Sequence, residues 1–142
     1  MAENTKERPV YRNIHVTQIV GYSLPPAGMV SILHRVSGAL MFLLLPFVVW
    51  LFDVSLGSEI SYERFSNAFI AGIGFVPAWL LKLVVLGLIW SYLHHLIAGL
   101  RHLWMDATHN VGRQFSRVSA LVTLASTGVL TLALGARLFG FI

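Results

Sequence analysis

The sequence contains no cysteine and few charged residues. Without cysteine, its 142 residues form no disulfide, no cysteine-ligated zinc site, no iron–sulfur cluster and no thiol nucleophile of their own. Only 11% of the residues are charged and 56% are hydrophobic, whereas soluble domains carry roughly a quarter charged residues. With a mean hydropathy of +0.74, this balance indicates an integral membrane protein.

The net charge of +4 comes from basic residues that flank apolar runs. They form no patch with interleaved aromatic residues, so we expect them to orient the chain in a membrane and not to bind nucleic acid. The opening MAENTKERPVYRN has no apolar core and is neither a secretory signal nor an acid-poor transit peptide. We therefore expect a bacterial inner (cytoplasmic) membrane. A processed mitochondrial chain would look the same, which leaves the mitochondrial inner membrane as a less favoured alternative.

Three apolar runs are long enough to cross a bilayer, which takes about 20 helical residues. The predicted architecture is all-α, with an N-terminal arm over 1–28, a membrane domain over 29–142, and spans at about 29–52, 77–103 and 119–141. Pro46 lies inside the first span and predicts a kink there. The stretch SYERFSNAFIAGIGF (61–75) is long for a tight connector and predicts a short helix along the membrane surface.

The basic residues predict the orientation of the spans. They concentrate in the N-terminal arm and in the connector between the second and third spans, whereas the first connector carries one arginine against three acidic residues. By the positive-inside rule, the N-terminus and the second connector lie on the cytoplasmic side, and the C-terminus lies outside.

Ionisable residues gather where the first span begins and where the second ends, two places that share a depth. The residues with i, i+3, i+4, i+7 spacing in the first span are Ser31, His34, Arg35 and Gly38. The residues with the same spacing in the second span are His95, Ala98, Gly99 and His102. Charged and ionisable groups at membrane depth are costly and by default indicate a functional site.

The second of these stripes has the shape of a haem site. His95 and His102 are seven residues apart, roughly 10 Å along a helix, and the small residues between them leave room for a flat group. An imidazole beside such a notch suits an axial haem ligand. The cationic or hydrogen-bonding partners that haem propionates need are available from His34, Arg35, Arg101 and His102.

Each of these residues also has a simpler interpretation when it is taken alone. An intramembrane histidine often only hydrogen-bonds a neighbouring helix, an arginine can reach to the interface, and glycines can be packing notches. We interpret His94, about 100° around the helix from His95, as a packing or interface residue. His34 lies only two turns into its span, so we expect no second histidine at the depth of His95 and a second axial ligand from another chain.

Three segments in order carry a family resemblance: RPV (8–10), SILHRVSG (31–38) and HLIAGLRHLWMD (95–106). With the three-span layout, they resemble the cytochrome b subunit of succinate dehydrogenase over nearly the whole chain. The pair SxxHRxSG and HxxxGxRHxxxD is far more specific than either motif alone. One mild departure is Thr108, where the family usually has a small residue.

The resemblance implies a role for each matching residue. His95 would be an axial ligand of haem b, which a histidine of a smaller anchor subunit would complete. Ser31 and Arg35 would line the ubiquinone site near the iron–sulfur subunit. The positions near the haem propionates, a looser assignment, would be His34, Arg101 and His102.

The implied function is that of a multi-pass membrane anchor of succinate dehydrogenase (respiratory complex II) in the tricarboxylic acid cycle. Its partners would be a flavoprotein subunit, an iron–sulfur subunit and the smaller anchor. Alone it would not oxidise succinate, because it has no nucleotide-binding fingerprint and no cysteine. Four alternatives stay open: a fumarate reductase anchor, an anchor without haem, menaquinone in place of ubiquinone, and a small transporter subunit with a histidine relay.

Overall fold

The computed structural model describes residues 15, 17–18 and 21–141, and these residues fold into helices joined by short connections. The helices are α2 (Pro26–Leu43), α3 (Leu45–Leu56), α4 (Glu59–Ala71), α5 (Ala78–Thr108) and α6 (Arg113–Phe139). The predicted all-α architecture is therefore confirmed. Most of the predicted N-terminal arm lies outside the described residues.

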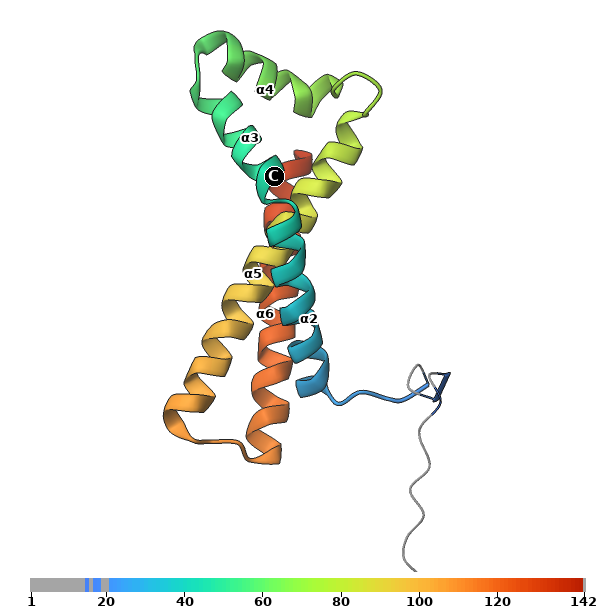
Figure 1. The fold of residues 1–142 in the computed structure, drawn as a ribbon, viewed down its shortest axis with the longest axis vertical. Coiled ribbons are helices and arrows are strands. Elements are labelled where there is room, and N and C mark those ends of the chain that lie inside the picture. Colours follow the sequence, from blue (N-terminus) through green and yellow to red (C-terminus); the bar gives the residue numbers. More distant parts are fainter. Residues whose placement is uncertain (1–14, 16, 19–20, 142) are drawn as a thin grey trace, which may run out of the picture.

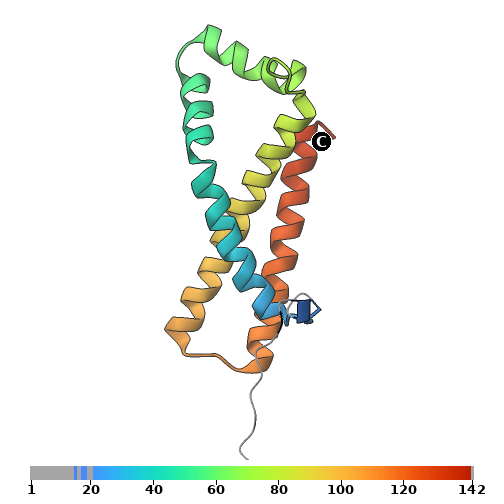
Figure 2. The same ribbon diagram turned by 45° about the vertical axis from the view of Figure 1, so that its right-hand side comes forward.

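Three of these helices, α2, α5 and α6, are long and apolar enough to cross a membrane. They pack against one another, and α2 crosses α5 near the middle of both helices (Figures 1 and 2). At the centre of this contact lie the buried side chains of Val30, Ala98 and Ala120. Because two of these three residues are alanines, the helix backbones can approach closely.

The first predicted span is divided between α2 and α3 at Leu44, whose backbone leaves the helical region at φ −91° and ψ 0°. Pro46 follows as the second residue of α3 and has no N–H to continue the α2 ladder. The predicted kink is confirmed. Beyond it, α3 diverges from α5 (Figure 1).

The short helix predicted between the first two spans is α4, which runs across from the end of α3 toward the start of α5 (Figure 1). Its first turn is closed reciprocally: the Ser61 N–H donates to Ser58 Oγ at 3.1 Å, and the Ser58 N–H donates to Ser61 Oγ at 2.7 Å. The helix ends at Gly72, where φ is +93° and a Cβ would collide with the carbonyl oxygen of Val76.

The membrane helices extend beyond the apolar runs that predicted them. Helix α5 continues to Thr108 instead of ending near 103, and α6 begins at Arg113 instead of near 119. Hydropathy indicates where the helix leaves the hydrocarbon core of the membrane, not where its backbone hydrogen bonds end. Those of α5 continue until the chain turns at His109, which has a left-handed φ of 53°. Helix α2 likewise begins at Pro26, inside the predicted arm.

Outside the contact between α2, α5 and α6, large apolar side chains are exposed along the helices. Phe42 is 76% exposed and Leu132 is 75% exposed. Surfaces of this kind require cover by lipid or by another protein. The completion of this helical bundle by a second anchor subunit stays a prediction.

Candidate functional site

The site begins with a stack of two imidazoles between α2 and α5. The rings of His34 and His95 lie face to face with centroids 4.1 Å apart and planes 11° from parallel. His102 meets the His34 ring edge-on at 5.3 Å. The expectation that no second histidine lies at the depth of His95 is wrong, because close packing of α2 against α5 brings His34 into the same layer.

Two stacked rings nevertheless do not make an axial pair. Axial ligands on opposite sides of a haem are separated by the macrocycle, whereas the His34 and His95 rings are in direct contact. We therefore still predict that the second axial ligand comes from another chain. The reason is the direct contact of the two rings and not the depth of His34 in the membrane.

The hydrogen bond of His95 fixes which ring nitrogen carries the proton. Its Nδ1 lies 3.1 Å from the carbonyl oxygen of His34. A carbonyl only accepts hydrogen bonds, so Nδ1 carries the proton and Nε2 keeps its lone pair. An Nδ1–H bond to a backbone carbonyl is how proteins orient an imidazole that binds a metal through Nε2. The donor set at this position therefore fits a haem ligand.

Gly38 allows this close approach of α2 to the imidazole. A Cβ at Gly38 would lie 3.1 Å from Cε1 and 3.3 Å from Nδ1 of His95, tighter than ordinary packing. A Cβ at Gly99 would lie 3.5 Å from His34 Nε2, an ordinary contact. The small residues between His95 and His102 were predicted to leave room for a flat group, but α2 fills this space: His34 lies against Gly99, and Ala98 packs in the core with Val30.

Ser37 is a buried residue of the site: it is a fixed position of the SxxHRxSG motif, but no role was predicted for it. Its Oγ donates to the His34 carbonyl at 2.9 Å and lies 3.4 Å from His95 Nδ1. Its position one residue before Gly38 and three after His34 is the signal that places a small hydroxyl in the same contact.

Ser31 and Arg35 lie one helical turn apart on α2 and apart from the imidazole stack. Ser31 is half-buried and Arg35 is exposed. Among the described residues, neither side chain has a hydrogen-bond or ion-pair partner. Both are therefore available to a group outside this chain.

Arg101 points to α6 instead of joining His34 and His102. Its Nε donates to Ser119 Oγ at 2.9 Å, and its Nη2 donates to the Ser116 carbonyl at 3.1 Å. The side chain is only 9% exposed. The structure thus separates Arg101 from the two histidines with which the sequence grouped it and uses it to join α5 to α6.

Replacing Arg101 by methionine is expected to lower the thermal stability of the purified protein by about 2 kcal/mol, because both charge-assisted hydrogen bonds to α6 are lost. Thermal unfolding in detergent measures this change. Arg113→Met is the matched control, since Arg113 is exposed at the start of α6 and its replacement should leave the unfolding temperature nearly unchanged. Equal stability of the two variants would contradict the role of Arg101.

His94 is buried against a neighbour on its own helix, as its packing interpretation predicted. It is 1% exposed, and its ring stacks on Trp90 at 5.5 Å. The ring lies near the Val30 backbone of α2, but neither ring nitrogen reaches hydrogen-bond distance and angle with a partner among the described residues. Burial of such unpaired polar atoms costs stability.

We accordingly expect His94→Leu to leave the unfolding temperature unchanged or to raise it, because leucine fills a similar volume without buried nitrogens. The comparison is made by the same thermal unfolding. A large fall in stability would show that the His94 nitrogens have a partner in the working protein.

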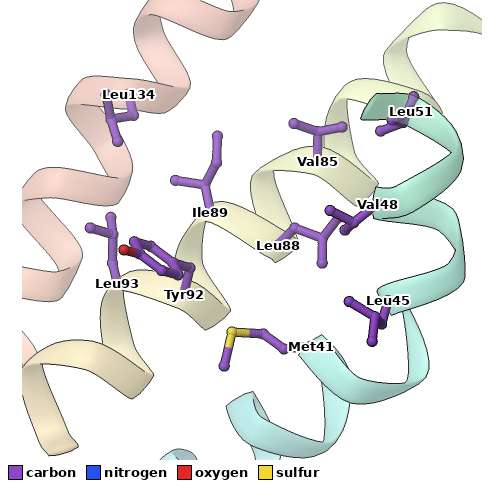
Figure 3. A pocket seen from close by; sticks show the side chains of 10 residues that line it. All are labelled: Met41, Leu45, Val48, Leu51, Val85, Leu88, Ile89, Tyr92, Leu93 and Leu134. Atoms are coloured by element: carbon purple, nitrogen blue, oxygen red, sulfur yellow. The ribbon is translucent and has the colours of Figure 1, made fainter. Parts of the chain in front are cut away.

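An apolar recess of about 510 Å³ lies one helical turn from the imidazole stack. Its side chains come from α2, α3, α5 and α6 (Figure 3): Met41, Leu45, Val48, Leu51, Val85, Leu88, Ile89, Tyr92, Leu93 and Leu134. Met41 follows Gly38 by three residues, and Tyr92 precedes His95 by three. The recess is therefore lined by apolar side chains and begins one helical turn from His95 along α5.

Comparison with known proteins gives a consistent set of similarities. Residues 4–134 match the model of a family described as succinate dehydrogenase/fumarate reductase transmembrane subunit. The succinate dehydrogenase cytochrome b556 subunit of Paracoccus denitrificans is 28% identical over 127 residues, which cover 89% of this chain and 88% of that protein. The subunit of the same name from Coxiella burnetii is 33% identical over 100 residues, covering 70% and 71%.

Proposed function

Since the chain belongs to the succinate dehydrogenase/fumarate reductase transmembrane subunit family, we propose that it is the haem-binding membrane anchor of a succinate dehydrogenase. The observation that carries the proposal is His95, with Nδ1–H held by the His34 carbonyl and Nε2 left for iron. The family includes fumarate reductase anchors, but both relatives described above carry the succinate dehydrogenase name.

In this proposal His95 would hold haem b through Nε2, and Gly38 lets the ring lie close to α2. When bound, the haem supplies a one-electron carrier within the membrane part of the complex. His34 and His102 border the ligand and offer hydrogen bonds to propionates. Arg101 is bound to α6, so we assign it to helix packing. A histidine of the smaller anchor subunit would complete the coordination of the iron.

Ser31 and Arg35 form this chain's part of the ubiquinone site. The Ser31 hydroxyl donates to a quinone carbonyl, and the Arg35 guanidinium stabilises the negative charge that develops on the oxygen as electrons arrive. Complete reduction takes two electrons and two protons per quinone. The support for this role is that both side chains have no partner among the described residues and are accessible from outside.

The remaining subunits follow from this role. A flavoprotein oxidises succinate, and an iron–sulfur subunit passes the electrons to the quinone on the cytoplasmic side of a bacterial inner membrane. The N-terminus and the connection between α5 and α6 lie on that side, where basic residues concentrate. The exposed apolar faces of the helices contact lipid and the smaller anchor.

The proposal is tested by producing the flavoprotein, iron–sulfur and small-anchor subunits with and without this chain. With the chain, membranes should reduce ubiquinone with succinate and show a b-type haem band in the reduced-minus-oxidised spectrum. Without it, succinate should still reduce an artificial dye but not quinone. Equal quinone reduction in both preparations would contradict the proposal.

A further inference from the structure

Ser37 shares a single acceptor with the proposed haem ligand. The carbonyl oxygen of His34 receives the Ser37 hydroxyl at 2.9 Å and the His95 Nδ1–H at 3.1 Å. As a carbonyl inside α2, it also accepts the helical N–H four residues later. Three donors therefore meet an oxygen that has two lone pairs.

The two side-chain donors compete for that oxygen. Because the Ser37 hydroxyl donates to the same carbonyl, the hydrogen bond from His95 Nδ1–H to that carbonyl is weaker than it would otherwise be. A stronger hydrogen bond from Nδ1–H makes the imidazole a more basic ligand through Nε2. A more basic ligand favours ferric over ferrous iron and so lowers the midpoint potential of a haem.

Ser37 Oγ also lies 3.4 Å from His95 Nδ1, where it accepts from the Nδ1–H. This contact is longer and therefore weaker than the 3.1 Å contact of Nδ1 with the His34 carbonyl, so the competition for the carbonyl sets the direction of the effect. Ser37 is 0% exposed, so no group outside the chain reaches it. The Ser37 hydroxyl is accordingly neither a haem ligand nor a quinone ligand.

We propose that Ser37 is a positioning residue that limits the strength of the His95 Nδ1–H bond and so holds the midpoint potential of the bound haem higher. The inference rests on the proposed function, because it requires haem on His95. It assigns a tuning role to a serine that is otherwise an ordinary helix-packing residue.

The test is a redox titration of haem in the assembled complex, followed by its visible spectrum, for wild type and Ser37→Ala. We expect the variant to keep a low-spin b-type spectrum and to titrate at a more negative potential than wild type. Ser37→Cys, whose thiol is a weaker donor of similar size, should shift in the same direction by a smaller amount.

Ser91→Ala is the matched control. Ser91 is also a fully buried serine, on α5 and one turn from His95, but its Oγ has no hydrogen-bond partner among the described residues. The midpoint potential of the haem in Ser91→Ala should stay at the wild-type value.

The outcomes separate this inference from the proposed function. A wild-type complex without haem would overturn both. Haem in the wild type with an unchanged potential in Ser37→Ala and Ser37→Cys would overturn the role of Ser37 alone. Assembly of both variants without haem would show that Ser37 is purely structural, which also overturns the inference.

Discussion

Replacing His95 by leucine is expected to remove low-spin haem b from the assembled complex. Leucine fills a similar space but has no nitrogen to bind iron, so one axial bond is lost. We expect the ratio of haem to flavin to fall at least ~10-fold, or the residual haem to become high-spin. Haem extraction and the reduced-minus-oxidised spectrum measure the two outcomes.

The neighbouring histidine provides a matched control for this result. His94→Leu makes the same chemical change one residue away, at a buried ring that stacks on Trp90. It should keep the wild-type haem content and spectrum. Loss of haem from His94→Leu with retention in His95→Leu would move the ligand to His94 and contradict the assignment.

Replacing Arg35 by alanine is expected to lower the turnover of quinone reduction by about 100-fold, because the charge that develops on the quinone oxygen loses its cationic partner. Ser31→Ala removes a neutral hydrogen bond and should cost less, about 10-fold. Succinate-dependent ubiquinone reduction in membranes measures both effects.

Two controls make the quinone prediction specific. Reduction of an artificial dye by succinate should stay at the wild-type rate, because it does not require the quinone site. Arg113→Ala removes another exposed arginine, from the α6 end that lies next to the α5–α6 turn, and should leave quinone reduction unchanged. Equal losses in Arg35→Ala and Arg113→Ala would indicate a general electrostatic effect instead of a quinone contact.

The number of spans, the kink and the connecting helix were predictable because each depends on local chemistry. Long apolar runs and a proline within one of them act over a few residues. Pro46 illustrates this, because the kink is read from the sequence and is present in the structure. The Ser58–Ser61 capping pair that begins α4 was not predicted. Helix ends were less accurate, because polar residues continue a helix beyond the membrane.

The partners of the polar side chains were less predictable, because they depend on how each helix is rotated about its own axis and so on which face it turns toward its neighbour. The i, i+3, i+4, i+7 stripe on α2 was treated as one face, yet its members divide: His34 and Gly38 contact His95, whereas Arg35 is exposed. A helix contact is narrower than such a stripe. Arg101 likewise lies beside the histidine stripe in sequence and reaches a different helix.

The most direct measurement is a density map of the assembled complex that resolves the iron and its ligands. We predict iron bound to Nε2 of His95, with His95 Nδ1 facing the His34 carbonyl and a histidine of a second anchor subunit on the opposite side. Iron bound to another residue of this chain, or a complex in which the His95 ring faces no haem, would contradict the assignment of His95.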